Sequence, residues 1–118
     1  GLDVCYPYTN QELQATIAAD HLLISEYPNH TKGYRNHFPE RNRIIAGLVQ
    51  SVLVTEAKKH SGSLITANLA LQNNRNVLAV PGSIMMPLSV GTNELIAAGA
   101  KPVLRELDIL EDYFQTRI

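Results

Sequence analysis

The chain has 118 residues, a formal net charge of −1 and a single cysteine, Cys5. This length predicts one domain, spanning residues 1–118, with one modest hydrophobic core. A lone cysteine excludes an internal disulfide and is typical of a reducing compartment, so we expect a cytoplasmic protein. No apolar run approaches the roughly 20 residues that cross a membrane, and we expect no membrane partner.

The first part of the chain alternates short apolar runs with helical periodicity. Thr9 and Glu12 have the spacing of a capping box, which places a helix start at Thr9. Pro39 suits the first turn of a second helix. In chain order the patterns predict a strand over 2–5, a helix over 9–20, a strand over 21–27, a polar loop over 29–37 and a helix from 39 to about 48.

The second part of the chain continues this alternation, which indicates an α/β fold with a parallel sheet covered by helices on both faces. Right-handed crossovers bring the strand-to-helix loops to the carboxyl edge of such a sheet, where open sheets bind their ligands. The patterns predict a buried strand over 51–57, a loop over 58–61, a helix over 62–74, a strand starting at 76, a loop over 81–90, a helix over 91–99, a strand over 101–104 and a terminal helix capped by Asp108.

The segment "KKHSGSLIT" joins a predicted strand to the next helix. Ser61, Gly62 and Ser63 would offer backbone amides at a helix N-terminus, where the helix dipole favours anions. Gly62 lets a phosphate approach the backbone closely, and Lys58 and Lys59 add positive charge. The alternative is that Ser61 or Ser63 is only an N-cap.

A basic block over residues 30–43 runs into the first turns of the second helix. Its charged side chains, Lys32, Arg35, Glu40, Arg41 and Arg43, sum to +3. Phe38 lies inside this block, and we interpret its ring as a stacking platform for a nucleobase, with Lys32 and Arg35 on the nucleic-acid backbone. The alternative is a hydrophobic plug that packs against the start of the helix.

The buried stripe of the second helix is predicted to be Ile44, Ile45 and Leu48. Arg41 precedes this stripe by one turn, so we expect it on the inward face of the helix, reaching along the ligand edge. The alternative is a buried arginine that pairs with a carboxylate such as Glu26 or Glu56.

A third glycine-rich region lies over residues 81–92. Gly82 follows a predicted strand and Gly91 opens a helix, which again indicates backbone close to an anion. Met85 and Met86 lie between them as adaptable apolar groups. The alternative is a tight loop that needs glycine for positive φ angles.

Four segments of this sequence, "HFPERNRIIAGL", "EAKKHSGSLITANLAL", "NVLAVPGSI" and "GTNELIAAGAKPV", resemble in order the bacterial DNA-processing protein A (DprA, also called Smf) family. The resemblance runs from "GLDVCYP" to the Lys-Pro-Val strand. It implies a Rossmann-like domain that binds single-stranded DNA, loads the RecA recombinase, serves natural transformation and forms homodimers. It implies neither catalysis nor a cofactor or metal.

Carried over by motif, the resemblance implies a DNA-binding set. The contacts to DNA would be Lys32, Arg35, Phe38, Arg41, Asn42 and Lys58, the phosphate would lie at Ser61, Gly62 and Ser63, and Thr66 and Asn93 would support that pocket. The family's Gly-Ser-Arg phosphate loop lies upstream of the segment that matches "GLDV" and is absent here. We therefore expect the C-terminal part of the family's domain, without its first strands.

Two other functions fit the sequence less well. Pro81-Gly82 and Gly91-Thr92 resemble the Pro-Gly-Gly-x-Gly-Thr motif of the lysine-decarboxylase-like nucleotide phosphoribohydrolases, which would make the chain a nucleotide-binding enzyme. The two halves of that motif are separated here by residues 83–90, and its glutamate falls two residues after Thr92 instead of three. Hydrolysis would need a placed acid, either His37 or Glu94. The third possibility is a structural fragment without binding of its own.

Overall fold

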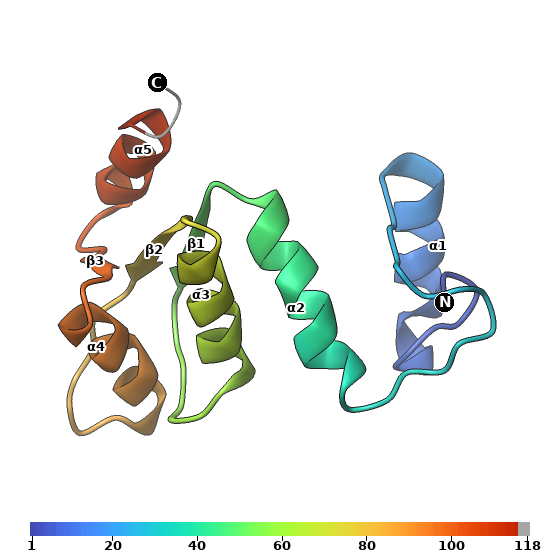
Figure 1. The fold of residues 1–118 in the computed structure, drawn as a ribbon, viewed down its shortest axis with the longest axis horizontal. Helices are drawn as coiled ribbons and strands as arrows, with labels where there is room; N and C mark the ends of the chain where they lie inside the picture. The colour runs from blue at the N-terminus through green and yellow to red at the C-terminus, as the bar shows by residue number, and fades with distance from the viewer. Residues whose placement is uncertain (116–118) are drawn as a thin grey trace. The chain divides into compact units, whose positions relative to one another are not determined.

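The structure is a computed structural model, and it describes residues 1–115. These divide into two compact units, the first Gly1–His37 and the second beginning at Phe38 (Figure 1). The boundary falls within the first two residues of helix α2 (His37–Leu48). The prediction of one domain over 1–118 stays a prediction, and each unit is described here by itself.

The first unit contains a 3₁₀ turn η1 (Tyr8–Asn10) and helix α1 (Gln11–Asp20). The helix therefore begins two residues later than predicted, and Thr9 lies inside the 3₁₀ turn, so neither η1 nor α1 has a side-chain cap hydrogen bond. The strands predicted over 2–5 and 21–27 are wrong: neither segment is a strand. Their apolar residues favour an extended chain, but within this unit neither has a partner strand to form a ladder.

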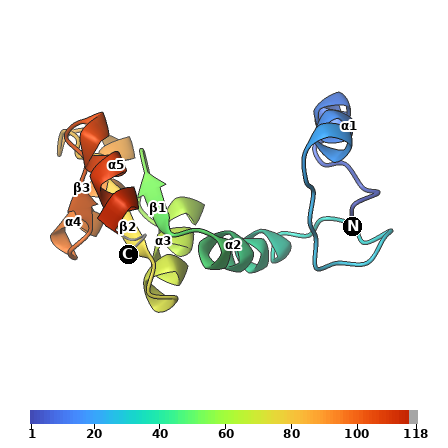
Figure 2. The same ribbon diagram turned by 90° about the horizontal axis from the view of Figure 1, so that it is seen from above.

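The second unit is built on a parallel sheet in the order β1-β2-β3, with strands Ser51–Val54, Asn76–Ala79 and Lys101–Pro102. Helices α3 (Gly62–Gln72) and α4 (Val90–Ala97) make the crossovers, and η2 (Pro87–Ser89) precedes α4. Helix α5 (Glu106–Gln115) follows β3 (Figures 1 and 2). The predicted strand–helix order of this unit is confirmed.

The two faces of the sheet follow from the side-chain alternation of the strands. Val54, Val77 and Ala79 lie on one face and join a buried cluster with Ala67 of α3 and Ala46 of α2. Ser51 and Asn76 lie on the other face, where both contact Asp112 of α5. Helices thus pack on both faces of an open parallel sheet, as predicted.

The buried cluster is rich in small side chains. Five of its eight members are alanines: Ala46, Ala57, Ala67, Ala70 and Ala79. Alanine lets helices and strands approach closely, so this core depends on close backbone packing more than on large side chains. At the end of α3, Ala70 is fully buried and the larger Leu71 is exposed.

Helix α5 begins at Glu106, two residues before the predicted cap. Asp108 reaches back from the first turn, and its carboxylate accepts hydrogen bonds from the backbone N–H of Leu104 (2.8 Å) and Arg105 (3.1 Å). The Leu104 N–H is the larger cause of a lowered pKa for the Asp108 carboxyl group. The aspartate therefore supplies the second half of a capping box, in which a side chain in the first turn accepts from the N–H groups ahead of the helix.

Candidate nucleic-acid interface

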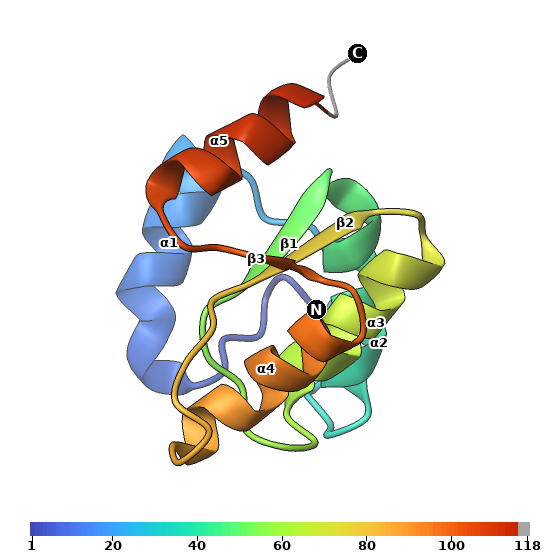
Figure 3. The same cartoon turned by 90° about the vertical axis from the view of Figure 1, so that its left-hand side faces the viewer.

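The carboxyl edge of the second unit gathers several of the predicted site residues. The β1–α3 loop, the β2–α4 loop and the beginning of α2 all reach the lower side of this unit in Figures 1 and 3. This arrangement follows from the parallel strands, because every crossover helix must start at the edge where its strand ends. The amino edge carries the opposite helix ends.

The N-terminus of α3 lies at this edge and begins at Ser61. Ser61 takes the N-cap position with extended backbone (φ −74°, ψ 160°), but its side chain makes no cap hydrogen bond. Its Oγ is buried and has no hydrogen-bond partner within residues 1–115. Ser61 therefore occupies the N-cap position without a side-chain cap hydrogen bond, and the choice between an N-cap at Ser61 or Ser63 and a phosphate contact stays a prediction. A buried hydroxyl without a partner costs free energy unless a ligand or water satisfies it.

Gly62 and Ser63 follow as exposed residues in the first turn of α3. The backbone N–H groups at this position have no carbonyl in the preceding turn, and the positive end of the helix dipole adds to their attraction for anions. A Cβ built on Gly62 meets no atom within 4 Å, so the space in front of the backbone is open. Thr66 donates its hydroxyl hydrogen to the Gly62 carbonyl (3.3 Å), which fixes the first turn of α3 from within.

The β1–α3 and β2–α4 loops are joined by backbone hydrogen bonds. Ala57 N–H donates to the Leu88 carbonyl (2.8 Å), and Gly91 N–H donates to the Ala57 carbonyl (2.8 Å). A Cβ on Gly91 would lie 2.7 Å from the Ala57 carbonyl oxygen, so only glycine permits this close approach. Lys58 and Lys59 follow Ala57 directly and are exposed, with no ion pair among the described residues.

Asn93 holds the β2–α4 loop at the carboxyl edge through two hydrogen bonds to the backbone of Gly82, which the sequence did not predict. Its Oδ1 accepts from Gly82 N–H (3.1 Å) and its Nδ2 donates to the Gly82 carbonyl (2.9 Å). The oxygen and the nitrogen of the Asn93 side-chain amide thus both bond to the backbone of Gly82, which lies in the β2–α4 loop. Gly82 must be glycine here, since a Cβ would lie 2.0 Å from the Ser89 Oγ.

The first turns of α2 bring Phe38, Arg41 and Asn42 together. The Arg41 Cζ lies 5.6 Å from the Phe38 ring centroid, a cation–π geometry, and its Nε (3.3 Å) and Nη2 (3.2 Å) donate to Asn42 Oδ1. Phe38 is 43% exposed, and its two predicted roles, a stacking platform and a plug against the start of the helix, both stay predictions. A flat ring with a guanidinium beside it offers both a stacking surface and a positive charge.

The expected inward position of Arg41 is wrong. Arg41 is exposed and makes no ion pair with a carboxylate among the described residues, whereas its neighbour Asn42 is buried. The buried stripe of α2 is Asn42 and Ala46 instead of Ile45 and Leu48, both of which are exposed. The helix presents Ala46 to the alanine-rich core, and this rotation leaves Arg41 exposed.

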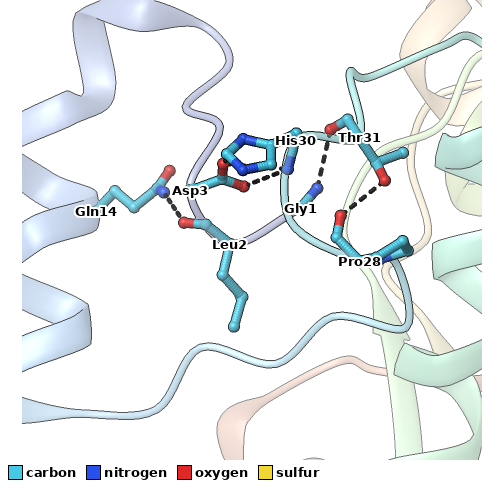
Figure 4. A network of polar contacts seen from close by, with 7 residues as sticks. All are labelled: Gly1, Leu2, Asp3, Gln14, Pro28, His30 and Thr31. Atoms are coloured by element: carbon cyan, nitrogen blue, oxygen red, sulfur yellow. Dashed lines mark hydrogen bonds and ion pairs between the residues drawn. The ribbon is translucent and has the colours of Figure 1, made fainter.

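The first unit contributes a basic loop by itself. Lys32 and Arg35 are exposed and make no ion pair within the described chain. The start of the loop is held by Asp3, whose carboxylate accepts the His30 N–H (2.8 Å) and lies 2.7 Å from the His30 Nδ1 (Figure 4). The His30 N–H is the largest cause of the lowered pKa of the Asp3 carboxyl group. The amino group of Gly1 donates to the Thr31 carbonyl (3.0 Å).

Sequence reasoning missed an aromatic cluster in this unit. The Tyr27 and His37 rings stack with centroids 4.3 Å apart, and Tyr34 meets His37 edge-on at 5.3 Å. Tyr34 is an exposed residue between Lys32 and Arg35. An aromatic residue between basic residues in the sequence is typical of a nucleic-acid surface, and this pattern could have predicted the cluster.

In the second unit, the structure thus gathers at one edge the lysines at 58 and 59, the Ser-Gly-Ser turn, Thr66, Asn93 and the start of α2. No three His, Cys, Asp or Glu side chains within residues 1–115 are placed to hold a metal ion. Over the same residues, no helix is long and apolar enough to span a lipid bilayer.

The sequence model of the DNA recombination-mediator protein A family matches residues 1–114. The chain belongs to this family. It is 50% identical over 113 residues to DNA processing protein DprA of Streptococcus pneumoniae, which covers 96% of this chain and 40% of that protein. It is 46% identical over 112 residues to DprA of Bacillus subtilis, covering 95% of this chain and 38% of the relative. The chain therefore spans about two fifths of the length of these family members.

Solved structures of family members have the same fold. The X-ray structure of DprA from Streptococcus pneumoniae matches with a TM-score of 0.88 and 51% identity, over 94% of this chain and 39% of that one. DNA processing protein A from Helicobacter pylori, whose structure describes a single-stranded DNA binding mode, matches with a TM-score of 0.86 and 28% identity, over 98% of this chain and 53% of that one. The predicted family and the Rossmann-like α/β class are confirmed.

Proposed function

We propose that this protein binds single-stranded DNA without sequence specificity. The observation that carries the proposal is the N-terminus of α3, where Gly62 and Ser63 are exposed and the space in front of Gly62 is open. A phosphate oxygen would accept from the backbone N–H groups of this first turn. DNA processing protein A of Helicobacter pylori, which has a single-stranded DNA binding mode, supports the choice of this ligand.

The other contacts divide between charge and stacking. Lys58 and Lys59 at the carboxyl edge and Lys32 and Arg35 in the first unit would neutralise backbone phosphates. Phe38 would stack on an unpaired base, with Arg41 beside the ring and Asn42 holding the guanidinium. Each unit would contact the DNA through its own exposed basic groups. Stacking on base faces is available in a single strand and hidden in a duplex.

We further propose the role that this binding serves. The protein would act in the cytoplasm by binding and not by catalysis, would hand single-stranded DNA to a RecA-type recombinase during natural transformation, and would work as a homodimer. The support is the family membership and the DNA-processing names of its relatives. Helix α5 offers an exposed apolar surface for self-association at Leu110 and Phe114.

A polarisation titration tests the binding proposal. Labelled oligo-dT and a duplex of equal length are titrated with the protein at two salt concentrations, since phosphate contacts make affinity depend on salt. We expect tighter binding to oligo-dT. Equal or tighter binding of the duplex would contradict the proposal. A parallel incubation with AMP, followed by detection of free adenine, distinguishes the nucleotide hydrolase, because a binding protein releases none.

A further inference from the structure

The β2–α4 loop carries three consecutive apolar side chains that the phosphate site does not use. Ile84, Met85 and Met86 are 86%, 81% and 55% exposed. Residues 76–93, which surround them in sequence, contain no charged side chain. Exposed apolar groups that cluster in this way mark binding surfaces in soluble proteins.

The conformation of this loop does not depend on those three side chains. Met85 N–H donates to the Ser83 Oγ (3.1 Å), Met86 N–H donates to the Ser83 carbonyl (3.1 Å), and Ser89 N–H donates to the Met86 carbonyl (3.0 Å). Asn93 holds Gly82 at the base of the loop. The loop is therefore ordered by its backbone and by polar side chains, and the apolar groups face solvent without a folding role.

The same loop is continuous with the candidate phosphate site. Its C-terminal end is bonded to Ala57 through Leu88 and Gly91, each at 2.8 Å, and Ala57 directly precedes the exposed Lys58. A strand held by phosphate contacts at Lys58 and the α3 N-terminus would pass this apolar surface. No acidic side chain lies in the loop to repel the strand.

We propose that Ile84, Met85 and Met86 form a contact for the bases of single-stranded DNA. This inference rests on the proposed function, and it assigns base recognition to a loop distinct from Phe38. Unpaired bases expose apolar faces; Ile and Met are among the side chains that insert between base steps, and the polarizable thioether of methionine makes favourable contacts with aromatic rings. The contact is sequence-tolerant, since every base offers such a face.

The test compares oligo-dT with an abasic oligonucleotide of the same length, whose phosphates remain and whose bases are absent. A variant combining Ile84→Ser, Met85→Ser and Met86→Ser should lose about fivefold or more in affinity for oligo-dT, in line with lost burial of apolar area. Its affinity for the abasic strand should stay unchanged. The matched control is Leu71→Ser, an exposed leucine at the C-terminal end of α3, which should alter neither affinity.

The outcomes separate this inference from the proposed function. If the parent protein binds neither oligonucleotide, the proposed function fails. If the parent binds oligo-dT and the triple variant binds it equally well, the loop serves another partner and the inference is overturned. An equal loss on oligo-dT and on the abasic strand would also overturn it, because the lost contact would not be to bases.

Oxidation provides a second measurement on the unmutated loop, which is decisive if the triple variant does not fold. Met85 and Met86 are the two methionines of this chain, and sulfoxide formation makes both side chains polar. In a Cys5→Ser background, peroxide treatment should weaken oligo-dT binding and leave abasic binding unchanged, and methionine sulfoxide reductase should restore the affinity. Unaltered oligo-dT binding after complete oxidation would contradict the proposal.

Discussion

The two edges of the parallel sheet in the second unit differ in whether their buried polar side chains have hydrogen-bond partners among the described residues. At the amino edge, Asp112 is buried and its carboxylate accepts from the Ser51 Oγ (2.5 Å) and the Asn76 Nδ2 (3.1 Å). At the carboxyl edge, the Ser61 Oγ is also buried, but no described residue satisfies it. Polar groups with protein partners serve the fold, whereas the exposed backbone N–H groups of Gly62 and Ser63 in the adjoining turn are open to a ligand.

The contrast has one exception at the amino edge. Arg75 donates from its Nη2 to the Gly47 carbonyl (3.0 Å), while its Nε is buried without a partner in the described chain. The guanidinium thus makes a hydrogen bond through Nη2 but not through Nε, and this bond links the end of α2 to the residue before β2. Among residues 1–115, the Ser61 Oγ is the buried hydroxyl that has no hydrogen-bond partner, and it lies beside the open N-terminus of α3.

The largest effect should come from filling the space in front of α3. We expect Gly62→Val to abolish DNA binding, because its side chain would project into the open space where a phosphate meets the backbone. The fold should persist, since a Cβ there meets no atom within 4 Å. Polarisation titrations and melting curves measure both properties. Gly47→Val, at a second open glycine near the other end of the unit, is the control. A folded Gly62→Val protein with parental affinity would contradict the phosphate site.

The amino edge should respond in stability and not in binding. Asp112→Ala leaves the Ser51 hydroxyl and the Asn76 amide without their acceptor, so we expect a loss of about 1–3 kcal/mol in the free energy of unfolding. The neighbouring Glu111→Ala, on an exposed side chain, should change stability by less than about 0.5 kcal/mol. Urea denaturation measures both, and affinity for oligo-dT is compared at a temperature where each variant is folded. Weakened DNA binding by a folded Asp112→Ala protein would break the distinction between the edges.

Phe38 and Arg41 should separate stacking from charge within the carboxyl edge. Phe38→Leu keeps apolar volume and removes the flat ring, so affinity should fall by about 1–3 kcal/mol with an unchanged dependence on salt. Arg41→Ala should lower affinity and reduce the log–log salt slope by about 0.7, the value for one phosphate contact of a single strand. Arg41 is exposed and has no carboxylate partner among the described residues, so its loss should leave the melting temperature nearly unchanged. Parental affinity in folded Phe38→Leu would remove the ring from the DNA site.

The smallest effect should come from Asp108, a carboxylate with partners near the carboxyl end of β3. Its pKa is lowered by the Leu104 N–H, so the folded chain gives up this proton more readily than the unfolded chain does. The stability it contributes is present above its unfolded pKa of about 4 and is lost as pH falls through the lower folded pKa. Asp108→Asn should reduce the loss of stability in this acidic window and leave DNA affinity unchanged. Identical acid unfolding of parent and variant would contradict this role.

The sequence predicted the second unit better than the first. Its strand and helix order follows from β-branched runs and helical periodicity, and the Ser-Gly-Ser turn falls where a parallel strand must feed a helix. In the first unit, two apolar runs were predicted as strands and are not, because periodicity indicates an extended chain without supplying a partner for its ladder. The local signal is the same in both units, and the partner strand makes the difference.

The position of the Ser-Gly-Ser turn at the start of α3 follows from the sequence, but the rotation of α2 does not. That these residues contact DNA stays a prediction. Ala46 belongs to a buried, alanine-rich cluster drawn from several elements, with Asn42 buried one turn before it and Arg41 exposed. The double hydrogen bond of Asn93 to Gly82 likewise depends on a loop geometry that no sequence pattern encodes.

The distinction between the two edges is tested most directly by an NMR titration of the ¹⁵N-labelled protein with oligo-dT. The account predicts that the backbone amides of Gly62 and Ser63 show the largest chemical-shift changes, since their N–H groups would donate to a phosphate. The amides of Ser51, Asn76 and Asp112 at the amino edge should stay unperturbed. Large changes at the amino edge with unmoved Gly62 and Ser63 amides would contradict it.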